Sequence, residues 1–348
     1  MFIRPEEYSS TLAFGSEIER IFSKRIFVGS QVRIPVENSY RSYIIGDRAL
    51  VTRNSAGSYH TLDNVCLHRG SLLLPVGYGS GDLRCRYHSW AYDSLGVLRQ
   101  APLCEISSIQ ERKLASFPTK AEFGLIFADL SGCELSMGAP LNALTAIGVP
   151  RNGQLTPFFN SEMLHEANWK LLVENVVEAY HVSFLHGPTL VKQGYSSASD
   201  ISYGSAESCT WHTITPKETS EERIRRFVPG YQRWYAHAYI PPNLFVAVTD
   251  GLIVYVGHFL PTDPHSTILE FELFETPRLA SMSNAVRQYF TESAVKFCFD
   301  TLEEDKEILH LQHQGLRCKR DPVQIQAIEP RVLQFHKYYR EAMDGFRE

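Results

Sequence analysis

The sequence predicts an α+β protein in which a small all-β domain precedes a larger domain whose antiparallel sheet is covered by helices. The chain has 348 residues, which is enough for about two domains of ~150 residues each. Residues 40–127 consist of short β-type runs separated by turn residues. Residues 235–274 hold four consecutive β-rich runs, and two helical patterns follow them. Consecutive strands with short turns between them predict an antiparallel sheet.

The elements of the first half follow from local patterns. Ile18, Ile21 and Phe22 recur on one face and predict a short helix over residues 17–27. Asn54-Ser55-Ala56-Gly57 separates two β-type runs and predicts a hairpin turn. The β-type runs include residues 43–45, 49–52 and 124–128. A stretch rich in Gly, Pro, Ala and Asn at residues 132–153 is interpreted as a linker.

The second half mixes both kinds of element. Residues 162–185 have a helical period, with an apolar stripe formed by Trp169, Leu172, Val173, Val176 and Tyr180. The four β-rich runs lie at residues 235–238, 244–248, 252–259 and 267–274. The two helical patterns after them cover residues 280–313 and 321–343. This order of elements predicts one mixed domain after the β domain.

Composition and charge exclude several classes of protein. Apolar residues make up 44% of the chain and charged residues 21%, which is too apolar for a disordered chain. The net charge of −5 provides no basic field, so nucleic acid is not an expected partner. The longest nearly apolar stretch, residues 252–260, is far shorter than the ~20 residues of a membrane span. Because Arg4, Glu6 and Glu7 precede any apolar run, no secretory signal is expected. We therefore expect a soluble, cytoplasmic protein.

Two of the seven cysteines lie beside histidines. Cys66-Leu67-His68 and Cys85-Arg86-Tyr87-His88 offer two thiolates and two imidazoles, which can hold zinc or an iron–sulfur cluster. In a Rieske cluster two cysteines bind one iron and two histidines bind the other, and each turn here can supply one ligand to each iron. A zinc finger more often pairs Cys with Cys and continues into a recognition helix, whereas Trp90-Ala91-Tyr92-Asp93 is strand-like. A structural zinc site is the alternative.

The segments Asn64-Val65-Cys66-Leu67-His68-Arg69-Gly70 and Cys85-Arg86-Tyr87-His88-Ser89-Trp90-Ala91-Tyr92-Asp93 resemble the Rieske domain of the Rieske non-haem iron oxygenases. The resemblance implies that a [2Fe-2S] cluster is bound by Cys66, His68, Cys85 and His88. One departure is Ser89, where the family usually has Gly. Because one small residue replaces another, this departure puts little of the resemblance in doubt.

A second constellation contains His181 and His186 at the end of a helical run. Two histidines and a carboxylate on one face of a metal form the facial triad of non-haem iron(II) oxygenases, which leaves positions open for dioxygen. On an ideal helix these two residues would lie about 140° apart, so they can share a metal only if the helix loosens between them. Gly187-Pro188 is a stop signal that favours such a distorted end. Considered alone, such a pair is more often structural.

The string Glu174-Asn175-Val176-Val177-Glu178-Ala179-Tyr180-His181, followed by His186, resembles the second signature of the same family. The resemblance implies that His181 and His186 bind a mononuclear Fe(II). Glu178 stands where most ring-hydroxylating members have an Asp, and the string is more similar to the branch of the choline, glycine-betaine and carnitine monooxygenases. The resemblance to the family implies an all-β Rieske [2Fe-2S] domain at residues 39–150 and a mononuclear-iron catalytic domain at residues 151–348. Residues 1–38 would then be a helical segment that packs on the catalytic domain.

The third iron ligand is predicted to be Asp305. The candidates are Asp300, Glu303, Glu304, Asp305 and Glu307. Asp305 shares a 3-4-3-4 spacing with apolar positions and therefore faces the core, where a carboxylate is costly unless it is paired or binds a metal. The residues with that spacing are Val295, Cys298, Leu302, Asp305 and Leu309. Glu304-Asp305 and the Gly315-Leu316 that follows also resemble the third-ligand helix of the family.

The resemblance implies a terminal oxygenase component that uses O2 and a small-molecule substrate. No dinucleotide-binding motif is present, so NADH or NADPH and flavin are expected on a separate flavin/iron–sulfur reductase, with or without a ferredoxin. The family is usually a homotrimer in which one subunit's cluster lies beside the next subunit's iron. Glu178, three residues before His181, is therefore expected to bridge the His88 of one subunit to the His181 of the next. The alternative of another class is a Rieske electron carrier without oxygenase activity.

The sequence leaves the substrate open. The position of Glu178 favours hydroxylation or N-dealkylation of a quaternary or tertiary amine, and mono- or dihydroxylation of an aromatic compound is the alternative. Aromatic side chains could cage an ammonium by cation–π attraction, line an aromatic-ring site or belong to the core. The candidates are Tyr203, Trp211, Tyr231, Trp234, Tyr235, Tyr239 and Phe245.

Overall fold

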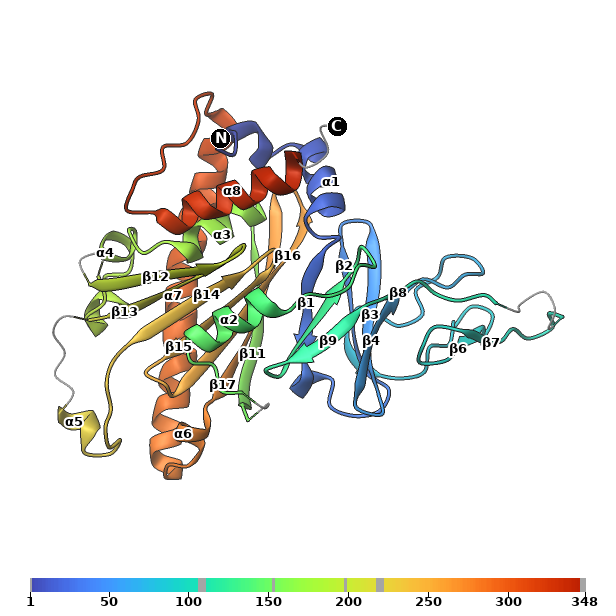
Figure 1. Cartoon of the computed structure of the whole chain (residues 1–348), viewed down its shortest axis with the longest axis horizontal. Helices are drawn as coiled ribbons and strands as arrows, with labels where there is room; N and C mark the ends of the chain where they lie inside the picture. The colour runs from blue at the N-terminus through green and yellow to red at the C-terminus, as the bar shows by residue number, and fades with distance from the viewer. Residues whose placement is uncertain (1, 106–110, 152–153, 197–198, 217–221, 345–348) are drawn as a thin grey trace. The chain divides into compact units, whose positions relative to one another are not determined.

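The computed structural model describes residues 2–105, 111–151, 154–196, 199–216 and 222–344. It contains two compact units. The β unit is Ile18–Ser136, and the larger unit consists of Met1–Glu17 together with Met137–Glu348. The predicted α+β class is confirmed, since the first of these units is built from β-strands and the second from a sheet with helices (Figure 1).

The β unit contains three antiparallel sheets. One has the order β5-β2-β3-β4-β8, the second β1-β10-β9, and β6 and β7 form a two-stranded sheet. The strands are β1 (Arg25–Ser30), β2 (Ser39–Ile45), β3 (Arg48–Ser55), β4 (Ser58–Asp63), β5 (Gly77–Ser80), β6 (Ala91–Tyr92), β7 (Leu98–Gln100), β8 (Ser116–Phe117), β9 (Thr119–Glu122) and β10 (Leu125–Asp129). The short helix η2 (Gln31–Arg33) follows β1. The predicted hairpin joins β3 to β4, with φ of 51° at Ala56 and 81° at Gly57, as a type I′ turn requires.

The predicted N-terminal helix is wrong in its bounds. Helix α1 is Thr11–Arg20, and β1 follows it where the second half of the helix was expected. The apolar run from Ile26 to Val28 is fully buried and pairs with β10, so it is a strand covered on both faces and not a helical stripe. The segment expected over residues 1–38 is accordingly divided, because residues 18–38 belong to the β unit.

The predicted linker at residues 132–153 is also wrong. It contains α2 (Gly138–Ala146), and the larger unit already begins at residue 137, not at 151. Ala139, Ala143 and Leu144 of α2 are buried, and the helix packs on β12, β13 and β14. The small residues of this stretch suggested a linker, but small side chains also allow a helix to pack closely against a sheet.

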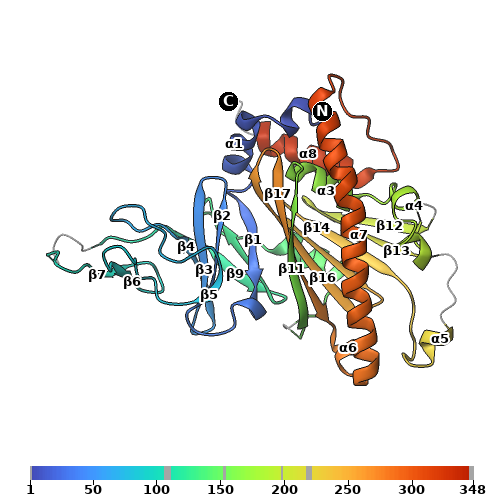
Figure 2. The same cartoon turned by 180° about the vertical axis from the view of Figure 1, so that it is seen from behind.

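The larger unit is built on one seven-stranded antiparallel sheet with the order β11-β17-β16-β15-β14-β13-β12. Its strands are β11 (Thr156–His165), β12 (Asp200–Ala206), β13 (Cys209–Thr215), β14 (Tyr235–Ile240), β15 (Leu244–Thr249), β16 (Ile253–Asp263) and β17 (Ser266–Glu275). The four predicted β-rich runs correspond to β14–β17. These central strands are buried almost throughout because α2 and α7 cover opposite faces of the sheet (Figures 1 and 2).

Besides α2, the described helices of this unit are η1 (Pro5–Tyr8), α3 (Trp169–Val177), α4 (Val182–Leu185), η4 (Val191–Gln193), α5 (Glu222–Arg225), α6 (Pro277–Ala280), α7 (Asn284–Cys318) and α8 (Pro330–Asp344). The single helix expected over residues 162–185 is wrong. Residues up to His165 complete β11, and the Asn168 side chain caps α3 by accepting the N–H of Lys170. Glu178 is extended, with φ −120° and ψ 164°, and ends α3. None of the described helices is long and apolar enough to span a membrane.

A buried ion pair joins the N-terminal segment of the larger unit to helix α3 of the same unit. Lys170 Nζ lies 2.6 Å from Glu17 Oε1, and both side chains are fully buried. Glu17 also accepts hydrogen bonds from Trp169 Nε1 at 2.7 Å and from the Tyr339 hydroxyl at 2.8 Å. Each charge therefore has the partners that burial demands.

Candidate active site

The two Cys/His turns of the β unit have the same backbone construction. Cys66 O accepts the N–H of Gly70 at 3.0 Å, and Cys85 O accepts the N–H of Ser89 at 2.9 Å. Each cysteine N–H in turn donates to the residue five positions later, Ser71 and Trp90, at 2.8 Å. The turns are thus equivalent, and each presents one thiol and one imidazole.

Ser89 occupies the left-handed position of the second turn. Its φ is 59°, and the equivalent Gly70 has φ 75°. Glycine adopts this conformation without steric cost, whereas an L-residue is strained there. The departure at Ser89 therefore adds backbone strain, but the second turn keeps the same backbone hydrogen bonds as the first, so the resemblance holds.

The four side chains divide into an inner and an outer pair. Cys66 and Cys85 are buried, whereas His68 and His88 are exposed. The two imidazole rings lie 4.6 Å apart between centroids, and Trp90 stacks on His68 at 4.8 Å. The arrangement suits a [2Fe-2S] cluster that is held by thiolates on its inner iron and by imidazoles on its outer iron.

Hydrogen bonds prepare the thiols for binding a metal. Burial raises the pKa of Cys85, but the backbone N–H groups of Tyr87 and His88 outweigh burial and hold this pKa below its usual value. The Tyr92 hydroxyl lies 3.4 Å from Cys66 Sγ and accepts the N–H of Leu67 at 3.0 Å. The strand β6, not a recognition helix, follows the second turn. These features fit a Rieske cluster better than a zinc finger.

In the larger unit His181, His186 and Asp305 converge on one point. Their nearest ligand atoms all lie within 4.8 Å of one another. His186 Nε2 lies 3.1 Å from His181 Nε2 and 3.2 Å from Asp305 Oδ1, and His181 Nε2 lies 3.8 Å from the same oxygen. Two imidazoles and a carboxylate aimed at one point are the donor set of a mononuclear iron site.

The break after α3 brings the two histidines together. His181 is the N-cap of the four-residue helix α4, and His186 is its C-cap. Because α4 is a separate short helix with one histidine at each end, the two side chains are not held about 140° apart as they would be on one continuous helix. The expectation that Glu178 and His181 share one helix is wrong, because Glu178 ends α3 in an extended conformation. Its carboxylate nevertheless contacts His181 Nδ1 and accepts the backbone N–H groups of Tyr180 and His181.

Each of the three converging side chains is oriented by a further polar group. Glu304 Oε2 lies 2.7 Å from His186 Nδ1 and accepts the Thr189 hydroxyl at 2.7 Å. Asn175 donates its amide N–H to Asp305 Oδ1 at 3.0 Å. Burial lowers the pKa of His186, but Asp305 and Glu304 outweigh it and hold this pKa above its usual value in the metal-free protein. The role of Glu304 was missed because helical phase places it beside Asp305 and not on the same stripe.

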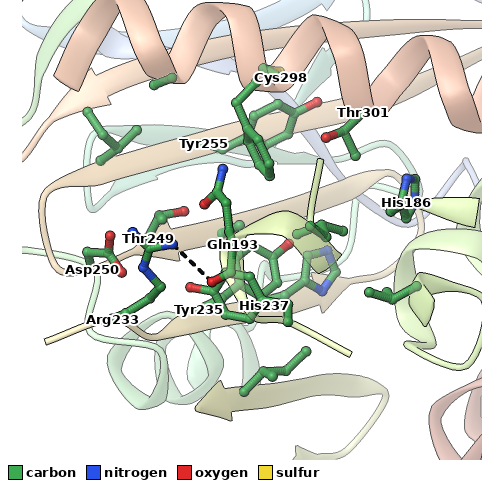
Figure 3. A pocket seen from close by; sticks show the side chains of 18 of the residues that line it. His186, Gln193, Arg233, Tyr235, His237, Thr249, Asp250, Tyr255, Cys298 and Thr301 are labelled. Atoms are coloured by element: carbon green, nitrogen blue, oxygen red, sulfur yellow. Dashed lines mark hydrogen bonds between the residues drawn. The ribbon is translucent and has the colours of Figure 1, made fainter. Parts of the chain in front are cut away.

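A cavity of about 490 Å³ opens from this point between the sheet and α7. Its floor includes one row of cross-strand neighbours in β13–β17, namely His212, His237, Ala247, Tyr255 and Leu273. Figure 3 shows His237 and Tyr255 of this row, with Cys298 and Thr301 from α7. His181, His186 and Asp305 line the same cavity. A substrate in the cavity would therefore lie beside the metal point, the place where the three ligand atoms converge.

Only some of the aromatic candidates line the cavity. Tyr231, Tyr235 and Phe245 line the cavity. Tyr203, Trp211, Trp234 and Tyr239 do not. The lining residues His212, His237 and Tyr255 were missed from the sequence. The alternation of β13, β14 and β16 could have indicated them, since they share one face of the sheet with Tyr235.

Two family models match the chain. The model of the ring hydroxylating alpha subunit (catalytic domain) matches residues 157–345, and that of the Rieske [2Fe-2S] domain matches residues 24–118. The oxygenase subunit of glycine betaine monooxygenase from Chromohalobacter salexigens is 30% identical over 51% of this chain and 42% of its own length. Choline monooxygenase of Beta vulgaris is 25% identical over 97% of this chain and 76% of its own.

A solved structure has the same fold across both units. Naphthalene 1,2-dioxygenase from Rhodococcus sp. matches with a TM-score of 0.79 and 18% identity, over 100% of this chain and 95% of that one. At this identity the match establishes the fold and leaves the substrate open.

Proposed function

The chain belongs to the ring-hydroxylating alpha-subunit family, and from that premise we propose that it is the oxygenase component of a Rieske non-haem iron oxygenase. Cys66, His68, Cys85 and His88 hold the [2Fe-2S] cluster. His181, His186 and Asp305 hold the mononuclear Fe(II). When bound, the cluster supplies electrons and the iron activates O2. The observation that carries the proposal is the convergence of three ligand atoms at the edge of a cavity.

The surrounding carboxylates fix how the two imidazoles face the metal. Glu304 beside His186 Nδ1 and Glu178 beside His181 Nδ1 accept hydrogen bonds from these nitrogens, so each ring carries its proton on Nδ1. Each Nε2 then offers its lone pair to the metal. Asn175 restrains Asp305 by donating its amide N–H to one carboxylate oxygen. The cavity lies on the remaining side, where it can bind substrate and exclude bulk water.

The substrate is a small quaternary or tertiary amine that is hydroxylated or N-dealkylated. Relatives named for glycine betaine and choline support this choice. Tyr235, Phe245 and Tyr255 give the cavity aromatic faces that attract an ammonium group. An aromatic substrate is the second candidate, because the same aromatic faces suit a ring.

Electrons come from a separate flavin/iron–sulfur reductase that oxidises NADH or NADPH. The assembly is a homotrimer in which Glu178 bridges the His88 of one subunit to the His181 of the next. Exposure of His88 in its own chain supports this arrangement, because an exposed imidazole is available to a neighbour. All seven cysteines lack disulfide bonds, which is consistent with a reducing cytoplasm.

The test is substrate-dependent NADH consumption by the purified chain with a surrogate reductase. Glycine betaine, carnitine, choline and simple aromatic compounds form the panel. We expect coupled oxidation with at least one amine and an oxidised or N-dealkylated product. Coupling only with an aromatic compound would select the second candidate. A Rieske spectrum without mononuclear iron, and without turnover of any compound, would identify an electron carrier instead.

A further inference from the structure

Arg331 of α8 is a buried cation whose hydrogen bonds all go to neutral groups. Its side chain is 1% exposed, and among the described residues it forms no ion pair. Burial lowers its pKa to about 9, so it stays protonated at neutral pH. A buried charge is costly unless an opposite charge compensates it. The protein therefore holds a positive charge that a bound anion could balance.

The guanidinium fixes the tautomers of two histidines. Arg331 donates to His212 Nδ1 at 2.8 Å and to His237 Nδ1 at 3.1 Å. Its remaining bonds go to Thr210, to the hydroxyl at 3.1 Å and to the carbonyl at 3.2 Å. A guanidinium can only donate, so both Nδ1 atoms accept. Burial and the Arg331 charge lower the pKa of both histidines well below the usual value, so the rings are neutral and carry their protons on Nε2.

These two N–H groups have no partner within the described part of the chain. His212 Nε2 and His237 Nε2 are buried and unsatisfied, although both residues line the cavity. The residues are direct cross-strand neighbours, with ring centroids 5.5 Å apart. Two adjacent donors without acceptors are costly unless a ligand satisfies them. Each donor is also polarised by the cation behind it.

We propose that His212 and His237 form a carboxylate subsite in the cavity, with Arg331 as the charge behind it. The two Nε2–H groups donate to the carboxylate oxygens, and the bound anion neutralises the buried guanidinium. The proposal rests on the proposed function and narrows it to an amine that also carries a carboxylate. The other arginine that lines the cavity, Arg233, already has Asp250 as its electrostatic partner, so it is not the anion site.

A zwitterion would be oriented by both ends. Tyr235 lies directly across from Ile214 and Thr249 in the row beside the histidines, and Tyr255 and Phe245 stack with centroids 5.2 Å apart. The ammonium group can lie against these faces while the carboxylate binds the imidazoles. Such two-point binding fixes which alkyl group is presented to the metal point.

The test measures binding without turnover. Glycine betaine and its amide, and benzoate and benzamide, are titrated calorimetrically into the metal-loaded protein. We expect the carboxylate of at least one pair to bind about tenfold more tightly than its amide, because charge-assisted hydrogen bonds are stronger than neutral ones. His212→Phe and His237→Phe should remove this preference. His237→Gln, which retains an N–H donor near Nε2, should keep part of it.

The matched control is His265→Phe, which replaces a histidine outside the cavity and should keep the full preference. The visible spectrum of the Rieske cluster and circular dichroism report whether each variant folds. Equal binding of acid and amide by the unaltered protein overturns the subsite, as does a preference that survives both substitutions. If the subsite is overturned but the protein still turns over an uncharged substrate, the oxygenase assignment is retained. A carboxylate preference without turnover of any compound would support the subsite and count against the proposed function.

Discussion

Glu304 and His186 form a direct contact, with Oε2 2.7 Å from Nδ1. Helix α7 therefore provides two adjacent carboxylates with different roles. Asp305 is one of the three converging ligand residues, and Glu304 accepts a hydrogen bond from the His186 ring. Adjacent helical positions point about 100° apart, so one residue can face the metal point while the other reaches behind His186. Thr189, which donates to the same oxygen, restrains Glu304 further.

Glu304→Gln is expected to weaken the mononuclear iron site and leave the Rieske cluster intact. An amide is a poorer acceptor than a carboxylate and does not raise the basicity of the imidazole, so iron affinity should fall roughly 10- to 100-fold. Iron retained after dialysis against a weak chelator, measured beside the Rieske spectrum, checks this. Glu303→Gln is the control, since that side chain is exposed on the same turn. Equal iron loss in both variants would contradict the orienting role.

Ser89→Gly is expected to stabilise the β unit by about 0.5–1 kcal/mol, because it relieves the left-handed strain at this position. The converse substitution, Gly70→Ala in the equivalent turn, should destabilise it by at least as much. Ser116→Gly is the control, since this residue lies in strand β8, where glycine carries an entropic penalty. Thermal loss of the cluster absorbance measures all three variants. A destabilising Ser89→Gly would show that the serine side chain makes a compensating contact.

Glu178→Gln is expected to leave both metal sites filled while turnover nearly stops. The substitution preserves shape but removes the charge beside His181, through which the neighbouring subunit's cluster is proposed to connect. Iron content and steady-state NADH consumption check the two halves of the expectation. Nearly normal turnover would limit Glu178 to its local hydrogen bonds with Tyr180 and His181.

Mixing two damaged chains tests the same bridge between subunits. A His88→Ala chain lacks an intact cluster, and a His181→Ala chain lacks an intact mononuclear site. Co-purified mixed trimers should recover some of the activity, because an intact cluster can meet an intact iron across an interface. Absence of rescue in demonstrably mixed oligomers would indicate electron transfer within one chain.

Glu17→Gln is expected to destabilise the larger unit by about 3 kcal/mol, because it leaves the Lys170 ammonium buried and unpaired. The double variant Glu17→Gln with Lys170→Met should recover much of that loss. Asp300→Asn breaks the exposed pair with Lys296 and should cost less than about 1 kcal/mol. Shifts of the denaturant midpoint measure these effects. Equal shifts for Glu17 and Asp300 would contradict the role of the buried pair.

The sequence predicted the fold class and the central strands because their signals are local. Strands β14–β17 are β-rich runs with clear turn residues between them. Helical phase selected Asp305 among the acidic candidates, and this residue is buried as expected. The helix break at Glu178 was not predicted, because residues 169–185 carry an almost uninterrupted helical pattern. Helix α3 ends there because the Glu178 carboxylate accepts the backbone N–H groups of Tyr180 and His181, and these contacts are seen only in the structure.

Relations between distant segments were beyond reach of the sequence. His212 and His237 lie 25 positions apart, and Arg331 joins them from a helix at the end of the chain. No periodicity connects such residues, because strand pairing and helix docking bring them together. Glu304 was visible as one of five acidic candidates, but its partner His186 lies 118 positions away.

The iron content per chain tests the central claim most directly. With the cluster and the mononuclear site filled, the unaltered protein should contain about three iron atoms per chain. His181→Ala and Asp305→Ala should each contain about two, with an unchanged Rieske spectrum. Asp300→Ala, which alters an exposed carboxylate of the same helix, should retain about three. A count of about two in the unaltered protein, unchanged by His181→Ala, would contradict the oxygenase and identify an electron carrier.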